Sequence, residues 1–403
     1  MEEEEKKEKI KSVIKSVVTF AIIILISVII IIVGKNKYGV EKKEDIKYIK
    51  AEIVSVFISE PEGVDEDSVV QRDISFEAKH FNKNTNKEEV IFGRQIISDT
   101  YPRKVVEEGN KVLLIKNEGS EIYSFVEYDK TNATLILVAS FVVLTIVVGF
   151  WKGFNTIIAL ALNAIVIFLV YIPSIIYGVN IYLATILLAL YVVSSGLILL
   201  NGWNKKTFAA IAGNVCGIAV AGILAVVLNK VFMITGILDE ESIFLQFIND
   251  DKRIDLVGII WAGVVIGALG AIMDTAMSVS STIREVSVNM EKKDFKTLFN
   301  SGMTVGRDAI GTMTNTLVLA YIGGAVSMTI LLVANSKDYL FLMNSEPIIV
   351  ELLQAIVGSI GILITVPFTV FIATMLEVKQ KKTDKKFIQP YSEGLSFNFK
   401  KDR

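Results

Sequence analysis

The sequence predicts an α-helical polytopic membrane protein with about eight transmembrane helices and a small β-rich extracytoplasmic domain between helices 1 and 2. Three observations support this fold class. Hydrophobic residues make up 52% of the 403 residues and the mean hydropathy is +0.54, which is high for a soluble protein. Apolar runs of membrane-spanning length recur along the chain, and the charged residues gather between them. Segment 35–131 instead alternates apolar and polar residues, as half-buried strands do.

The first apolar run extends from Val17 to Val33 and follows a lysine-rich segment. A cleaved signal peptide is the alternative interpretation, but no small-x-small cleavage site follows the run. We therefore predict a cytoplasmic N-terminal segment over 1–16 and a retained signal-anchor helix over 17–34.

Residues 35–131 are predicted to form the extracytoplasmic β-rich domain. Its stretches IKAEIVSVFI (49–58) and KVLLIKNEG (111–119) have the period of strands. The chain has one histidine, His80, which lies in this domain, and one cysteine, Cys216, which lies in an apolar run. One cysteine excludes a disulfide within the chain, and we expect neither a metal site nor a cofactor.

Seven further apolar runs predict a membrane core over 132–376, followed by a basic cytoplasmic tail over 377–403. Each run is close to the roughly 20 residues that cross a bilayer as a helix. The runs cover 133–150, 154–177, 181–201, 207–229, 255–280, 310–334 and 347–376.

The charges of the loops predict the orientation. With the N-terminus inside, the inner ones among the short loops between the spans hold most of the lysines and arginines of those loops, as the positive-inside rule requires. The outer loop 173–180 has none, and loop 230–254 balances its basic residues with acidic ones. We expect a bacterial cell membrane protein with both termini in the cytoplasm. The inner basic residues are Lys152, Lys205, Lys206, Arg284, Lys292, Lys293, Lys296 and Arg307, followed by the tail after Lys379.

An acid interrupts the run 255–280. Gly263, Gly267, Gly270 and Asp274 fall at i, i+4, i+7 and i+11, so they share one helical stripe. Glycines allow a second helix to approach closely, and an acid within the membrane normally faces such an interface. The alternative is an acid that has reached the inner surface and contacts water.

The next two runs also carry polar stripes. Asp308, Thr312 and Asn315 recur at i, i+4 and i+7, and Arg307 precedes them as a possible partner of Asp274 or as a simple positive-inside anchor. In the last run the stripe comprises Glu351, Gln354, Gly358, Gly361, Thr365 and Thr369. Three polar, glycine-lined helices are typical of the interior of a transporter, but also of the packing core of an assembly protein.

Three long stretches resemble the YibE/F family of bacterial membrane proteins: GALGAIMDTAMSVSSTIREV (267–286), GRDAIGTMTNTLVLAYIGG (306–324) and GSIGILITVPFTVFIA (358–373). The likeness covers the chain from the first apolar run to Thr374, and the anchor with its outer domain is similar to the longer, YibE-like type. Besides the lipid bilayer, a shorter YibF-like membrane protein or a second copy of the chain is then an expected partner. A weaker likeness, between MDTAMSVSSTIRE followed by TMTNTLVLA and the SecD/SecF motor of the resistance-nodulation-division superfamily, implies proton-coupled work. Two extra spans depart from that pattern.

We therefore expect a secondary transporter or exporter, coupled to ions or protons, of unknown substrate. Asp274 would carry the ion, while Arg307, Asp308, Thr312, Asn315 and Glu351 would line the route. Helix packing is assigned to Gly263, Gly267, Gly270, Gly358 and Gly361. The alternative is a non-enzymatic assembly or accessory factor that binds a partner through its outer domain. We expect neither an enzyme nor a nucleic-acid partner, because the sequence has no HExxH or Walker motif and no Ser/His or Cys/His pair within the membrane.

Overall fold

The computed structural model describes residues 2–38, 48–59, 71–82, 86–98, 104–116, 119–248, 253–290, 293–335 and 338–378. The chain divides into two compact units. The helical unit comprises Met1–Val40 and Gly149–Arg403, and the β unit comprises Glu41–Val148.

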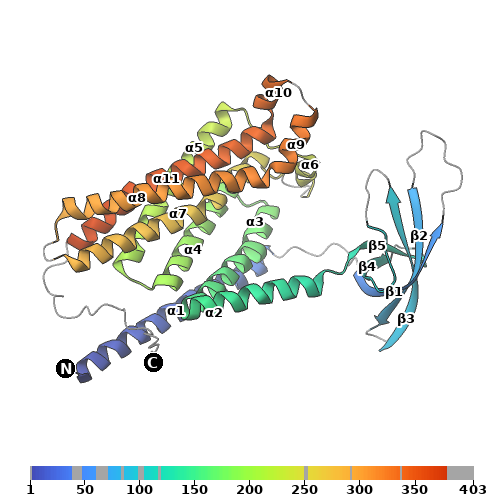
Figure 1. Ribbon diagram of the computed structural model, residues 1–403, viewed down its shortest axis with the longest axis horizontal. Helices are drawn as coiled ribbons and strands as arrows, with labels where there is room; N and C mark the ends of the chain where they lie inside the picture. The colour runs from blue at the N-terminus through green and yellow to red at the C-terminus, as the bar shows by residue number, and fades with distance from the viewer. Residues whose placement is uncertain are drawn as a thin grey trace, which may run out of the picture. The chain divides into compact units, whose positions relative to one another are not determined.

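Five strands form a closed barrel in the β unit (Figure 1). Their order around the barrel is β1-β2-β3-β5-β4. All neighbours are antiparallel except β3 and β5, which are parallel where Gly93 and Arg94 pair with Tyr123 and Ser124. This is a five-stranded Greek-key barrel of the OB-fold type. The strands are β1 (Tyr48–Ser59), β2 (Gln71–Asn82), β3 (Lys87–Ser98), β4 (Lys111–Lys116) and β5 (Tyr123–Tyr128).

The alternation in the sequence explains the barrel interior. Ile74, Phe76 and Ala78 of β2 are buried, while Ser75 between them and Lys79 after them are exposed. Gly93 of β3 lies under the ring of Phe76, where any side chain would collide with it. The predicted small β domain is therefore confirmed, and β1 and β4 lie where the two alternating stretches predicted strands.

The remaining elements are helical. Several begin after a side chain that accepts a hydrogen bond from a backbone N–H of the first turn: Asn180, Asn204, Asp239, Asp255, Asp294 and Asp338. The elements are α1 (Glu2–Tyr38), α2 (Thr131–Val166), the π-helix η1 (Ile167–Tyr171), α3 (Ile172–Ile176), α4 (Ile181–Asn201), α5 (Lys205–Val231), α6 (Glu240–Leu245), α7 (Leu256–Asn289), α8 (Phe295–Gly324), α9 (Val326–Asn335), α10 (Tyr339–Asn344) and α11 (Glu346–Val378).

Helix α11 is the centre of the helical unit, where it packs against α5, α7 and α8 (Figure 1). Small residues allow the close approach of α5 and α11. A methyl group at Gly217 would lie 2.9 Å from the carbonyl oxygen of Gly361 and would also strike the hydroxyl of Thr365. Glycines at helix crossings are typical of membrane bundles, because without a hydrophobic force between helices close packing must hold them together.

The described residues contain six helical segments long and apolar enough to cross a membrane, or seven if α8 and α9, bent by 59°, form one span. They support a polytopic membrane protein, but the predicted count of eight is not confirmed. The difference lies at 131–176, where α2, η1 and α3 form one segment of 46 residues instead of separate spans over 133–150 and 154–177.

The backbone of α2 leaves helical geometry at Phe150, with φ 48° and ψ −130°. A continuous helix of 46 residues would be about 70 Å long. That is more than twice the ~30 Å hydrocarbon thickness of a bilayer. That segment 131–176 crosses the membrane twice, with the two helices meeting at Phe150, therefore remains a prediction.

Candidate functional site

The glycine stripe of α7 forms an exposed face of the helical unit. Gly263, Gly267, Gly270, Asp274 and Ser278 are all exposed, although most residues beside them on α7 are buried or half-buried. We call these five residues the α7 open face. It borders α4 on one side, where Met273 approaches Gly196, and α8 on the other, where Tyr321 meets Gly267.

The three glycines differ in what they face. A methyl group at Gly267 would collide with the hydroxyl of Tyr321, and one at Gly263 would lie 3.8 Å from Nε2 of Gln354. At Gly270 it would meet nothing within 4 Å. Among the described residues, therefore, side chains rather than a second helix backbone approach this stripe of α7. The glycines predicted on the last apolar run differ: Gly358 and Gly361 of α11 are buried in contact with Leu317 and Ile272.

The Asp274 carboxylate has neither a hydrogen bond nor an ion pair with any residue that the structure describes. Two contacts between the antiparallel helices α7 and α8, Val279 with Gly306 and Gly267 with Tyr321, show which part of α8 lies at the level of Asp274. They place Asp274 level with residues 311–314, and Arg307 roughly one helical turn away along the axis. The expected pairing of Arg307 with Asp274 is not formed.

Two buried hydroxyl groups lie on the side of α8 next to the α7 open face. Arg307, Thr314 and Tyr321 are spaced by seven residues and so share one stripe. Among the described atoms, Thr314 Oγ1 and Tyr321 Oη are buried without a hydrogen-bond partner. Buried polar atoms normally have such partners, so these two hydroxyls are exceptions within the described bundle. Sequence reasoning missed both residues, although the seven-residue spacing from Arg307 was visible.

Glu351 continues this row of polar groups beyond Tyr321, towards one end of the bundle. This residue of α11 is half-buried and lies within electrostatic range of the Tyr321 hydroxyl. Gln354, one turn further along α11, is the residue nearest to Gly263. Glu351 of α11, Tyr321 and Thr314 of α8, and Asp274 of α7 therefore follow one another along the bundle, and we call these four residues the polar seam.

Asp308, Thr312 and Asn315 lie elsewhere. They are exposed on the face of α8 that points away from α7 and α11. The Thr312 hydroxyl donates to its own helix, to Ala309 O at 3.1 Å. The structure thus divides the predicted pathway into two groups, with Asp274 and Glu351 on the seam and the α8 stripe on another face.

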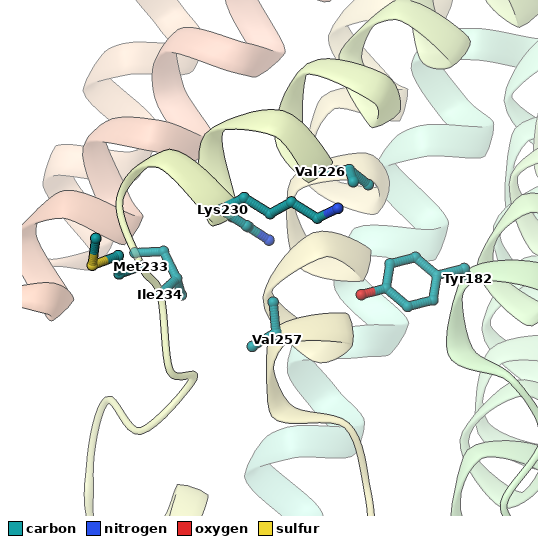
Figure 2. A pocket seen from close by; sticks show the side chains of 7 residues that line it. Tyr182, Val226, Lys230, Met233, Ile234 and Val257 are labelled. Carbon is teal, nitrogen blue, oxygen red and sulfur yellow. The ribbon is translucent and has the colours of Figure 1, made fainter.

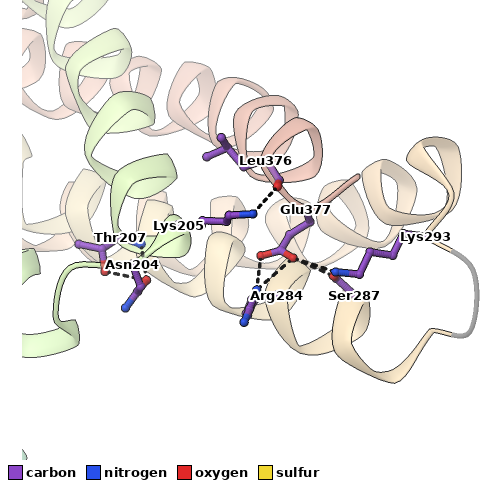
Figure 3. A network of polar contacts seen from close by, with 8 residues as sticks. All are labelled: Asn204, Lys205, Thr207, Arg284, Ser287, Lys293, Leu376 and Glu377. Carbon is purple, nitrogen blue, oxygen red and sulfur yellow. Dashed lines mark hydrogen bonds and ion pairs between the residues drawn. The ribbon is translucent and has the colours of Figure 1, made fainter. Parts of the chain in front are cut away.

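A carboxylate that the sequence did not single out has the richest set of partners. Glu377, whose side chain is 3% exposed, accepts hydrogen bonds from Arg284 at 2.9 and 3.2 Å, Ser287 at 3.0 Å and Lys293 at 3.3 Å (Figure 3). Lys205 donates to the neighbouring Leu376 carbonyl at 3.3 Å. This Glu377 network joins the ends of α5, α7 and α11, and we call that end of the bundle the Glu377 end. The sequence had assigned Glu377 to the basic tail, but α11 continues to Val378.

A second carboxylate fastens the opposite end of α11, which we call the Glu346 end. Glu346 accepts hydrogen bonds from the backbone N–H groups of Thr235 at 2.9 Å and Gly236 at 2.7 Å, and from the Thr235 hydroxyl at 2.9 Å. Gly236 has φ +87°, a conformation that suits glycine. Both ends of α11 are therefore held by acids with several donors, in contrast to Asp274.

A cavity of about 300 Å³ lies between α4, α5 and α7, at the opposite end of these helices from the Glu377 network. Figure 2 shows the Lys230 amine and the Tyr182 hydroxyl pointing into it. Asn229 also lines it, and its buried Oδ1 has no hydrogen-bond partner among the described atoms. None of the residues predicted from the sequence lines this cavity.

Comparison with known proteins identifies one family. The family described as YibE/F-like protein matches residues 137–379, which is more than half of the chain. No curated protein and no solved structure matches the chain. The weaker likeness to the SecD/SecF motor stays a prediction.

Proposed function

We propose that this chain, which belongs to the YibE/F-like protein family, is a secondary transporter or exporter that couples movement of a solute to a proton or ion gradient. The substrate is not specified by the site. The proposal assigns the chain no covalent chemistry.

The observation that carries the proposal is the isolated Asp274 carboxylate. It lies on a helix of membrane-spanning length, and it has no partner among the described residues. An ionisable side chain within a membrane-spanning helix costs free energy, and in membrane proteins it typically marks an ion or proton pathway. A structural acid would instead be surrounded by donors, as Glu377 is.

The polar seam supplies a route for the ion. Tyr321 and Thr314 offer hydroxyl oxygens between Glu351 and Asp274, and both are unpartnered within the described part of the bundle. The glycines of the α7 open face leave space along the same line. Water or a hydrated cation could exchange along these groups, since each is able to accept a hydrogen bond or coordinate.

The proposed orientation follows the loop charges. The Glu377 end, with Lys205, Arg284 and Lys293, would face the cytoplasm, and the Glu346 end would face outward. The barrel would then be extracytoplasmic and both termini cytoplasmic, in the bacterial cell membrane. A proton driven inward would pass Glu351 before Asp274.

A proteoliposome assay tests the proposal. The purified full-length chain is reconstituted with an imposed pH gradient, and the rate at which candidate ions and solutes dissipate the gradient is measured against empty vesicles. At least one solute should accelerate dissipation. A null result for all of them, with the protein shown by protease protection to be folded and inserted, would instead favour the accessory role below.

A second candidate function rests on the surface of the barrel. Val90, Phe92 and Ile96 are 58%, 59% and 54% exposed on the outer face of β3. An apolar row of this kind suits binding of a partner protein, as expected of an assembly or accessory factor. Co-expression with a shorter YibF-like protein tests it. Phe92→Ser should then abolish co-purification, whereas Lys111→Ser on β4, a strand that does not neighbour β3, should not.

A further inference from the structure

The outward face of α8 is not covered by any residue that the structure describes, and its chemistry is unsuited to lipid. Leu298, Gly302, Gly306 and Leu317 are buried on the side of α8 that packs on α7 and α11. The opposite side is exposed and carries several polar side chains. We call it the α8 polar face, and it comprises Thr304, Asp308, Gly311, Thr312 and Asn315, with Arg307 at its edge.

The position of this face along the bundle places part of it within the apolar layer. By the alignment of α7 with α8, Asn315 is level with residues 270–273, inside the apolar run of α7, and Asp308 is nearer to the Glu377 end. The side chains of Asn315, Asp308 and Arg307 make no hydrogen bond or ion pair with any described residue. The Asn315 amide within the apolar run, and the two charges between it and the Glu377 end, require a polar neighbour rather than acyl chains.

We propose that a second copy of this chain covers the α8 polar face, related by a two-fold axis parallel to α8. A two-fold axis brings the same patch of both copies together, so the patch must complement itself. The α8 polar face meets this condition. This proposal goes beyond transport by a single chain. It requires only that the chain is inserted in a membrane, and it does not depend on the transport proposal.

Helical geometry shows the complementarity. Arg307 and Asp308 are successive residues, so they project about 100° apart and lie on opposite flanks of the face. In a parallel, two-fold pair, one flank of each helix faces the other flank of its mate. Arg307 of each copy therefore faces Asp308 of the other, which forms two reciprocal ion pairs. Gly311 and Asn315 lie near the middle, where glycine allows close approach and an amide can both donate to and accept from its mate.

The most obvious cover from within the chain does not fit. The first half of α2, residues 131–148, is exposed and apolar. It carries no charged side chain, and its polar groups beyond the first turn are Ser140 and Thr145. It can pair with neither Arg307 nor Asp308. The charge pattern of the face thus favours a second copy.

Disulfide crosslinking of the full-length chain in membranes tests the proposal. Starting from Cys216→Ala, Gly311→Cys places a thiol on the face, where a Cβ meets no atom within 4 Å and folding should be unaffected. Leu319→Cys, 59% exposed on α8, is a second reporter. Val215→Cys on α5 is the matched control, since it is 38% exposed at a similar depth and away from α8.

Oxidation should give a covalent dimer from Gly311→Cys with at least roughly ten-fold the yield of Val215→Cys, because a disulfide requires Cα atoms within about 7 Å. Adding Asp308→Arg should reduce the yield about ten-fold by opposing like charges, and the exchange Arg307→Asp with Asp308→Arg should restore it. The proposal is overturned if neither α8 reporter exceeds the control, or if Asp308→Arg leaves the yield unchanged. Because transport is not measured, failure here leaves the role of Asp274 standing.

Discussion

Two acids of the bundle show how differently one residue type can be surrounded. Glu377 is buried with Arg284, Ser287 and Lys293 as donors, and it lies at the junction of three helices. Asp274 lies on an exposed stripe of glycine and serine and has no partner among the described residues. We infer that Glu377 holds the fold together and that Asp274 is free to bind and release an ion.

Glu377→Gln should destabilise the bundle. It leaves the guanidinium of Arg284 and the amine of Lys293 without their negative partner, which should cost about 1–3 kcal/mol because both cations are partly exposed. Thermal unfolding in detergent measures the effect. Lys205→Met, which removes only a bond to the Leu376 carbonyl, serves as the milder control. Equal melting temperatures for Glu377→Gln and the wild type would show that the network is not structural.

A pair of glycine substitutions separates close packing from open space. Gly217→Ala forces a methyl group against the Gly361 carbonyl and Thr365, and should cost about 1–3 kcal/mol. Gly270→Ala meets no atom within 4 Å, and it should be neutral or stabilise by up to about 1 kcal/mol through helix propensity. The same melting assay compares them. Loss of stability in Gly270→Ala alone would contradict the described packing of α7.

Spacing in the sequence predicted which site residues share a helical face, but not what each face meets. Gly263, Gly267, Gly270 and Asp274 do lie together on one side of α7. Arg307 nevertheless lies about one turn from Asp274, and Asp308 projects from another side of α8. Such neighbours are determined by how helices rotate against one another, and period 3.6 within one helix carries no information about that rotation.

Among the helices and strands, a uniform apolar run or a regular alternation predicted an element well, whereas segments of mixed polarity and contacts between distant residues were not predicted. Helix α4 coincides with the apolar run 181–201. Helix α8 begins at Phe295, well before the predicted 310, because Asp294 caps it and its first turns are too polar for a hydropathy signal. In the barrel, alternation predicted strands. Closure through the parallel β3–β5 pair depends on contacts between distant residues, which alternation does not show.

The barrel should fold as an isolated fragment of residues 41–134, without disulfides, and should give β-type circular dichroism with a cooperative melt. It should also be acid-sensitive. Hydrogen bonds from Thr131 and Lys50 lower the pKa of Asp129 from 3.8 to about 2. A lowered pKa stabilises the folded state above pH 4, and this contribution is lost as the pH falls from about 4 to 2. Asp129→Asn should flatten that part of the pH profile. A fragment without cooperative melting would show that the barrel depends on the helical unit.

At the scale of the whole molecule, the orientation and the number of crossings are open to a direct test. In the Cys216→Ala background, an impermeant maleimide should label Val90→Cys in intact cells. Lys152→Cys and Lys296→Cys should react only after permeabilisation, because their loops are predicted inside. Labelling of Lys296→Cys in intact cells would refute the orientation. A Lys152→Cys thiol that stays inaccessible after permeabilisation would show that 131–176 does not cross twice.

If Asp274 carries the coupling ion, transport should require a side chain that titrates at this position, and the rate of pH-gradient dissipation by Asp274→Asn proteoliposomes measures this. Asparagine keeps the shape and hydrogen-bonding capacity of the side chain but cannot titrate. Glu285→Gln is the matched control, since it makes the same change on the exposed side of α7 near the Glu377 end. The account predicts that substrate-dependent dissipation collapses in Asp274→Asn and persists in Glu285→Gln, with both proteins folded and inserted. Wild-type rates in Asp274→Asn would contradict it.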